Sequence, residues 1–151
     1  MHSLVYRSVA NESFTVPQIY GMLSKAKDYN IEHGITGCLL YHNNHFLQLL
    51  EGKENEVLSL FHKISSDNRH TAIKMLENNR TKNRVFDEWS MAFHDYGQNG
   101  LSANLKLGQI DTFLKDADAF NKNSRSVLSF FGSVKDVLFS NWAMNSIALL
   151  F

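Results

Sequence analysis

The chain has 151 residues, which suits one domain with a real core, or such a domain followed by a helical extension. Lysine plus arginine equals aspartate plus glutamate at 15 each, and this neutral balance argues against a general nucleic-acid binder, which needs a basic surface. Cys38 is the single cysteine, so no intramolecular disulfide can form and a reducing location is favoured. The N-terminus lacks a signal-peptide pattern, and no segment approaches the ~20 apolar residues that span a bilayer. We therefore expect a cytoplasmic protein with no membrane segment.

A short strand and a long helix are predicted first along the chain. Alternating side chains indicate a strand over Ser3–Ser8. The segment Thr15-Val16-Pro17-Gln18 is typical of a helix start, because Thr15 can cap the helix and Gln18 sits where a capping box places its glutamine. The helix then has one face, at spacings of four, three and four, that carries Ile19, Leu23, Ala26 and Asn30. Asn30 therefore points an amide toward the interior.

A β-hairpin is predicted at Asn43-Asn44, since asparagine tolerates positive φ better than most residues. Gly34 ends the helix, and Ile35–Tyr41 forms the strand that leads into the hairpin. The strand after the turn has two apolar faces, one with Phe46, Gln48 and Leu50 and the other with Leu47 and Leu49. Burying the Gln48 amide without partners costs roughly 1–3 kcal/mol, so we expect a polar group opposite it.

The rest of the core is predicted to contain a second helix and two more strands. The helix fits Glu54–Ser66, with two acidic residues near its N-terminus, and the strands fit Ala72–Leu76 and Ser90–Phe93. The order β-α-β-β-α-β-β is a ferredoxin-like α+β pattern with one added strand and two helices on one face of the sheet. This pattern predicts a core domain over residues 1–96.

Residues 97–151 have a different character and are predicted to form a helical extension. Apolar stripes at helical spacing run from Ile110 to Phe120 and from Val127 to Leu138. The second apolar face of the sheet needs a cover, and this C-terminal helical pair is the candidate. The tail from Trp142 to Phe151 has no charged residue, which is consistent with either core cover or an exposed interface.

A phenol and two amides are predicted to line one cleft. If the first two helices cover the sheet face that bears Tyr6 and Gln48, Asn30 lies on the same side. Such groups suit a planar heterocycle with carbonyls and N–H groups, because amides donate and accept at once. The alternative is an ordinary buried polar network in which Tyr6 and Gln48 bond to each other and to the backbone. His42 and His45 flank the hairpin without a carboxylate or cysteine cluster, so no metal site is expected.

From Leu4 to about His94 the chain resembles the BLUF (blue light using flavin) photoreceptor domain. Six motifs carry the resemblance in the right order: Leu4-Val5-Tyr6-Arg7-Ser8, Asn30 with Gly34-Ile35-Thr36-Gly37, Phe46-Leu47-Gln48 with Leu50-Glu51-Gly52, Asp67-Asn68-Arg69-His70, Arg84-Val85-Phe86 and Trp89-Ser90-Met91. The resemblance implies a noncovalently bound FAD between the first two helices. It also implies a sensor without a catalytic role of its own.

The resemblance implies specific roles along the chain. Tyr6 would donate an electron and a proton, and Gln48 would bridge Tyr6 to the flavin and rearrange after light absorption. The expected flavin-binding residues are Tyr6, Tyr29, Asn30, Gln48, Arg69 and His70, and the pair expected to transmit the signal is Trp89 and Met91. No output domain follows, so the chain resembles the short class that acts through a separate protein partner and forms a homo-oligomer.

Two other functions share the predicted topology. An acylphosphatase-like hydrolase would use arginine and asparagine for phosphate, but the sequence has no Gly-rich loop to cradle one. An RNA-binding domain needs exposed aromatic residues on the sheet in basic surroundings, whereas the charge is neutral and the strands are predicted to be buried. An absorption spectrum distinguishes all three functions.

Overall fold

The computed structural model describes residues 1–42, 44–87, 92–95, 129–136 and 149–150. Two helices and six strands with assigned bounds lie in this part of the chain, together with helical residues at 129–136. In chain order they are β1 (His2–Ala10), α1 (Val16–Glu32), β2 (Thr36–His42), β3 (His45–Gly52), α2 (Glu54–Ser65), β4 (His70–Arg80), β5 (Ala92–Asp95) and β6 (Leu149–Leu150).

The strands form one sheet in the order β4-β1-β3-β2-β5-β6. The first four are antiparallel to one another, β5 runs parallel to β2, and β6 is antiparallel to β5. The four-stranded antiparallel unit with α1 and α2 is the predicted ferredoxin-like α+β fold. The added strand β5 is also confirmed. β4 is longer than the predicted Ala72–Leu76, and β6 was not predicted.

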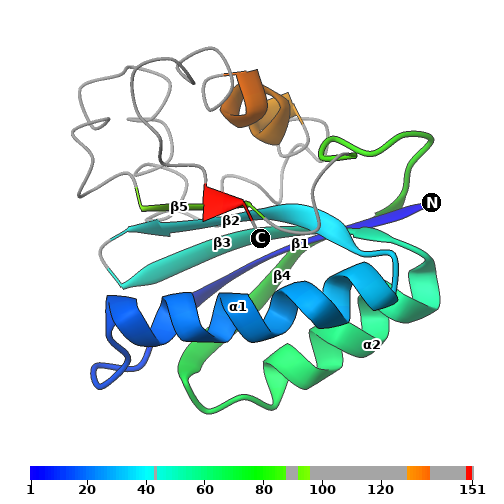
Figure 1. Cartoon of the computed structure of the whole chain (residues 1–151). Helices are drawn as coiled ribbons and strands as arrows, with labels where there is room; N and C mark the ends of the chain where they lie inside the picture. Colours follow the sequence, from blue (N-terminus) through cyan, green and yellow to red (C-terminus); the bar gives the residue numbers. More distant parts are fainter. Residues whose placement is uncertain (43, 88–91, 96–128, 137–148, 151) are drawn as a thin grey trace.

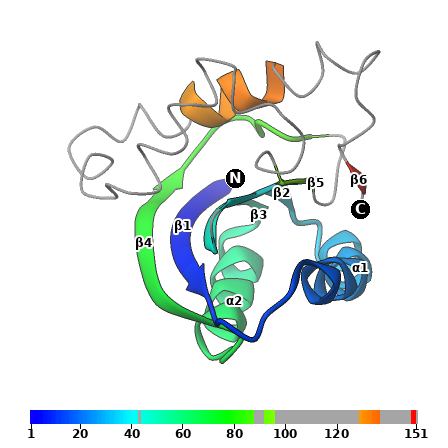
Figure 2. The same ribbon diagram turned by 90° about the vertical axis from the view of Figure 1, so that its left-hand side faces the viewer.

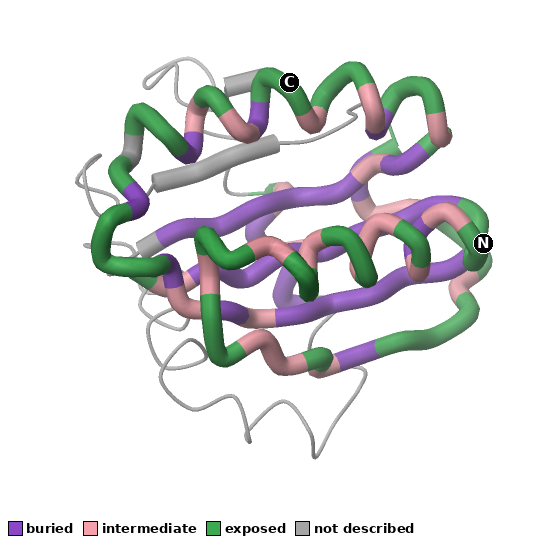
Figure 3. The backbone as a smooth tube through the Cα atoms, turned by 90° about the horizontal axis from the view of Figure 1, so that it is seen from below, coloured by how far each residue is buried: buried purple, intermediate pink, exposed green. Residues whose placement is uncertain are grey.

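Helices α1 and α2 lie side by side on one face of the sheet (Figures 1 and 3). The predicted capping box begins α1: the Thr15 N–H donates to Gln18 Oε1 at 2.7 Å, and the Gln18 N–H donates to Thr15 Oγ1 at 3.4 Å. The buried stripe of α1 packs with the sheet residues that share the face of Gln48, in a core that includes Leu4, Ile19, Leu23, Leu39 and Leu50. This is the face on which the cleft was predicted.

The two-residue connection between β2 and β3 confirms the predicted hairpin. β2 ends at His42 and β3 begins at His45, with the two strands paired up to that point. Asn44 has a φ of 63°, the left-handed conformation that asparagine tolerates. Asn43 lies outside the described residues. The turn fixes the register that places Leu39 opposite Gln48.

Residues 129–136 lie on the opposite face of the sheet from α1 and α2, as Figures 1 and 2 both show. Phe130, Phe131 and Val134 are buried there, and the Lys135 ammonium lies 3.6 Å from the Asp87 carboxylate. These residues belong to the second predicted stripe of the extension. The first stripe, at 110–120, and the predicted domain boundary after Tyr96 lie outside the described residues.

The segment after β4 is anchored to the sheet by the buried Glu51 and the half-buried Arg84. Glu51 accepts hydrogen bonds from the Val85 N–H at 2.8 Å and the Phe86 N–H at 3.0 Å. Arg84 donates to the carbonyl oxygens of Glu51 and Gly34, each at 2.7 Å. Burial raises the pKa of the Glu51 carboxyl, whereas these N–H groups and the nearby Arg84 lower it. The described helices include none that is long and apolar enough to cross a membrane.

Candidate functional site

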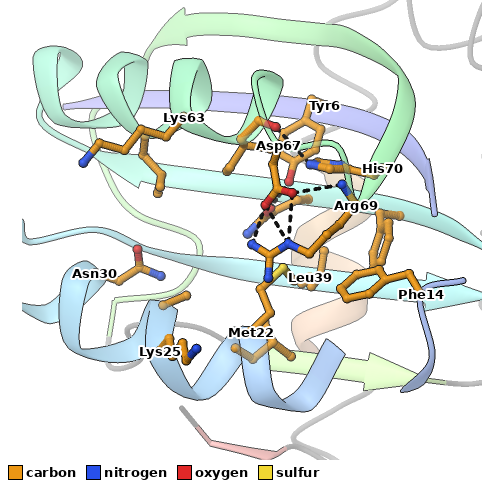
Figure 4. Close-up of a pocket in the computed structure, with 16 residues that line it drawn as sticks. Tyr6, Phe14, Met22, Lys25, Asn30, Leu39, Lys63, Asp67, Arg69 and His70 are labelled. Carbon is orange, nitrogen blue, oxygen red and sulfur yellow. Dashed lines mark hydrogen bonds and ion pairs between the residues drawn. The ribbon is translucent and has the colours of Figure 1, made fainter. Parts of the chain in front are cut away.

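A pocket of about 280 Å³ opens between α1, α2 and the sheet (Figure 4). Its apolar walls come from α1, α2 and the strands, and polar groups from β1, α1, β3, α2, the turn after α2 and β4 converge on it. The lining residues on which the following argument depends are Tyr6, Asn30, Gln48, Asp67, Arg69 and His70. An apolar pocket with a few convergent polar groups is the usual form of a small-molecule site.

Tyr6 and Gln48 form the base of the pocket. They are register partners on the adjacent strands β1 and β3, and the Tyr6 hydroxyl donates a hydrogen bond to Gln48 Oε1. Both side chains are buried. Burial, reinforced by the Asp67 carboxylate, raises the pKa of the Tyr6 phenol far above its usual value. The phenol is therefore neutral and remains a proton donor throughout the physiological pH range.

Asn30 supplies a second amide from the last turn of α1. Its side chain is 1% exposed, and its Oδ1 atom has no hydrogen-bond partner among the described residues. A buried acceptor without a partner costs roughly 1–3 kcal/mol. The pocket therefore contains an acceptor that a bound molecule with an N–H group would satisfy.

Asp67 and Arg69 form an ion pair in the turn between α2 and β4. The Arg69 Nε–H donates to both Asp67 carboxylate oxygens at 2.9 and 2.8 Å, and a second guanidinium nitrogen bonds to Oδ2. The backbone N–H of Arg69 also donates to Asp67 Oδ1 at 3.0 Å. The hydrogen bonds from Arg69 lower the pKa of Asp67, so this carboxylate stays ionised. Figure 4 shows the pair reaching across the pocket toward α1.

His70 connects the sheet to α2 at the pocket wall. Its Nδ1 lies 2.8 Å from Ser8 Oγ, and its Nε2 lies 3.0 Å from the Ile64 carbonyl oxygen. A carbonyl only accepts, so a neutral ring with its proton on Nε2 satisfies both bonds, with the Ser8 hydroxyl donating to Nδ1. Burial lowers the pKa of His70, with Asp67 and the Ile64 carbonyl opposing the shift.

Five of the predicted site residues line this one pocket: Tyr6, Asn30, Gln48, Arg69 and His70. Tyr29 does not line it. The Tyr29 ring stacks on His33 with centroids 3.9 Å apart, and the Lys63 ammonium lies 4.2 Å from the Tyr29 ring centre. Trp89 and Met91 lie outside the described residues, so their signalling role stays a prediction.

Sequence reasoning missed several lining residues, among them Phe14, Met22, Lys25 and Lys63. For α1 a signal was present: Gln18, Met22 and Lys25 have spacings of four and three, parallel to the apolar stripe and offset by one residue. Met22 and Lys25 of this second stripe line the rim of the pocket. Among the described residues, no group of three or more His, Cys, Asp or Glu could hold a metal ion.

Comparison with known proteins identifies relatives of this pocket-bearing domain. Residues 1–92 match the family model described as "BLUF: Sensors of blue-light using FAD". The Escherichia coli (strain K12) protein "Blue light- and temperature-regulated antirepressor BluF" is 36% identical over 93 residues, which cover 62% of this chain and 23% of that protein. "Photoactivated adenylate cyclase subunit alpha" of Euglena gracilis is 32% identical over 93 residues, covering 60% of this chain and 9% of that protein. The chain thus spans less than a quarter of either relative.

Solved structures agree with this match. "BlrB - a BLUF protein, dark state structure" superposes with a TM-score of 0.69 at 28% identity, covering 88% of this chain and 96% of that chain. "BlsA ground state" gives a TM-score of 0.62 at 34% identity, covering 71% of this chain and 72% of that chain. Both likenesses extend over most of the described fold.

Proposed function

The chain belongs to the family of blue-light sensors that use FAD, and on this premise we propose that it binds FAD noncovalently and reports light through Tyr6 and Gln48. The observation that carries the proposal is the buried Tyr6–Gln48 hydrogen bond at the base of a pocket that also holds the unpaired Asn30 acceptor. A flavin ring fits this donor set, because its edge presents carbonyl and N–H groups to the Asn30 and Gln48 amides.

Tyr6 is the proposed source of the electron and the proton. A bound flavin would supply blue-light absorption and, when excited, a high electron affinity. The neutral Tyr6 phenol would give an electron to the excited flavin and so be oxidised, and its Oη proton would pass along the hydrogen bond to Gln48 Oε1. Both return afterwards, which restores the phenol, so no covalent bond to the protein is needed.

Gln48 is the residue whose rearranged side chain we propose to persist after the electron and the proton have returned to Tyr6. Its amide has a carbonyl end and an amino end, so rearranging the amide exchanges an acceptor for a donor. We expect the rearranged amide to direct a stronger hydrogen bond at the flavin carbonyl, which shifts the absorption slightly to the red until the amide relaxes. In the ground state the bond from Tyr6 holds the carbonyl end of Gln48 toward β1.

The signal is proposed to pass from the site across the sheet. Successive register pairs form one row from Gln48 on β3 to Leu39 on β2, Phe93 on β5 and Leu149 on β6. Residues paired in this way are direct neighbours, so a change at Gln48 has a short path to the C-terminal strand. The proposed receiver is a separate protein partner, or a second copy of the chain in a homo-oligomer.

The test is an absorption spectrum of the protein reconstituted with FAD, before and after blue light. We expect a flavin spectrum that shifts slightly to the red, because one hydrogen bond to the flavin is altered, and that recovers in darkness. A bound flavin whose spectrum does not respond to light would refute the sensor mechanism. Phosphatase activity in a colourless protein would instead support the acylphosphatase-like alternative, which no described feature of the pocket favours.

A further inference from the structure

We propose that a polar groove beside the pocket binds the phosphate groups of the flavin nucleotide, with Lys25 as their principal cation. This inference rests on the proposed flavin binding and concerns the phosphate-bearing chain attached to the ring. It predicts that the protein distinguishes FMN and FAD, which carry phosphate, from riboflavin, which does not.

The groove shares one wall with the pocket. Four residues line both: Phe14, Met22, Lys25 and Arg69. Beyond this shared rim the groove continues over amide and hydroxyl side chains, which are Asn11, Ser13, Gln18 and Asn68. A molecule whose ring occupies the apolar pocket therefore leaves it over the shared rim and enters a polar environment.

The polarity of the two cavities matches the two halves of a flavin nucleotide. The deep part of the pocket is walled by the apolar stripe of α1, and Asn30 ends this stripe with the unpaired buried acceptor. The groove is walled by the neighbouring stripe of the same helix, which contains Gln18, Met22 and Lys25. A single helix thus presents an apolar face to the ring and a polar, cationic face to the chain attached to it.

Lys25 is the cation at the shared rim that has no bonding partner among the described residues. Arg69 is held by the Asp67 carboxylate, so much of its charge is neutralised within the turn. Lys63 donates a hydrogen bond to the Tyr29 hydroxyl at 3.1 Å. By contrast, Lys25 makes no ion pair or hydrogen bond with any residue that the structure describes. Figure 4 shows Lys25 and Met22 on α1, across the pocket from the Asp67–Arg69 pair.

The energetic expectation follows from the exposure of the Lys25 side chain. An ammonium at a solvent-exposed rim attracts a phosphate only moderately, because water screens the interaction. We expect FMN and FAD to bind about two- to fivefold more tightly than riboflavin, with the difference shrinking as salt rises from about 50 mM to about 500 mM. Riboflavin affinity should barely depend on salt.

The experiment measures dissociation constants of riboflavin, FMN and FAD by quenching of flavin fluorescence. The variant Lys25→Gln removes the charge, and Lys27→Gln is the matched control: it makes the same change two residues away, at an exposed position that lines neither cavity. Lys25→Gln should weaken FMN and FAD binding by most of the two- to fivefold difference and leave riboflavin binding unchanged. Lys27→Gln should change none of the three.

Each other outcome overturns the phosphate groove. The proposal is wrong if the wild-type protein binds all three flavins equally, or if FMN binds no better than riboflavin. It is also wrong if Lys25→Gln weakens the binding of riboflavin as much as the binding of FAD. Failure of the underlying function looks different, because then none of the three flavins binds to any of the proteins. The two failures are therefore distinguishable in one set of titrations.

Discussion

Tyr6 combines a donor hydroxyl with a ring that packs in the core, and these two roles can be separated by mutation. The ring lies 5.5 Å from the Phe61 ring centre, whereas the hydroxyl bonds to Gln48. Tyr6→Phe keeps the ring contacts and removes the proton donor. The variant should therefore bind flavin and show no reversible red shift under blue light, as measured by absorption spectroscopy.

Tyr41→Phe is the matched control for Tyr6→Phe. Tyr41 is a buried tyrosine on the same face of the sheet, but its hydroxyl donates to Asn44 Oδ1 at 3.1 Å in the hairpin and it does not line the pocket. Its variant should keep the full light response. A normal response in Tyr6→Phe would show that another group supplies the electron and proton.

His70 gives the pocket a pH dependence with a definite sign. Burial lowers its pKa below the ordinary value of 6.5, so the unfolded chain binds the proton more readily than the folded protein does. The contribution of His70 to stability is therefore complete above about pH 6.5 and is lost as the pH falls through the folded-state pKa. Protonating Nδ1 would also remove the acceptor for the Ser8 hydroxyl.

The measurement is the free energy of unfolding by urea at about pH 7.5 and about pH 5.5, for wild type and His70→Gln. Wild type should lose more stability than the variant on going to the lower pH. Comparing the two proteins cancels the contributions of the other titrating groups to the pH dependence of stability. These groups include Glu51 and Glu77, whose raised pKa values favour the folded protein at lower pH. Equal losses would show that His70 titrates normally.

At the scale of elements, the two ends of α1 are each fixed by local structure, and this positions Asn30 in the last turn of the helix. The capping box sets its start, and Gly34 follows its end with a φ of 63°. The Ile35 N–H then donates to the Asn30 carbonyl oxygen at 2.8 Å, which ties the chain reversal to the pocket residue. A non-glycine residue at position 34 must adopt the left-handed conformation that its Cβ disfavours.

Two glycine substitutions in this region should have opposite effects on stability. Gly34→Ala should lower the free energy of unfolding by about 1 kcal/mol, because of its positive φ. Gly21→Ala should raise it by about 0.5–1 kcal/mol, since Gly21 lies inside α1 and an added Cβ meets no atom within 4 Å. Denaturant unfolding of both variants checks this, and a stabilising Gly34→Ala would contradict the assigned helix end.

At the scale of the whole molecule, the sheet connects the pocket to the C-terminal part of the chain. Gln48, Leu39, Phe93 and Leu149 occupy one row across four strands. On the other face, Glu51 of the same strand β3 holds the segment at 85–86, and Asp87 pairs with Lys135. Strand β3 is therefore coupled to the C-terminal region through both the sheet and its second face.

Light should consequently change amide hydrogen exchange in β5 and in residues 124–151 of the flavin-bound protein. The physical reason is that altered bonding at Gln48 changes the strength of strand pairing along its row. Mass spectrometry in light and darkness measures this, and the light-insensitive Tyr6→Phe variant serves as control by showing no difference. Identical exchange in wild type under both conditions would refute the proposed output route.

Local sequence determined the features that depend on neighbouring residues. Thr15 and Gln18 form the capping box because three residues of spacing suffice, and the Asn43-Asn44 turn fixes the hairpin in the same way. Strand alternation placed Gln48 on a buried face, and helical spacing placed Asn30 toward the interior. Together with the motif resemblance, these local rules predicted the fold and five residues of the pocket.

Features that depend on distant partners were decided only by the tertiary structure. The polar end of β4, as far as Arg80, is a strand because β1 supplies its backbone bonds, and β6 forms because β5 offers an edge. Tyr29 turned toward His33 and Lys63, whereas Lys25 became part of the rim, because packing of α1 against α2 sets which stripe faces the cavity. A linear pattern gives the spacing of side chains on one element, but the cavity they line depends on how separate elements pack together.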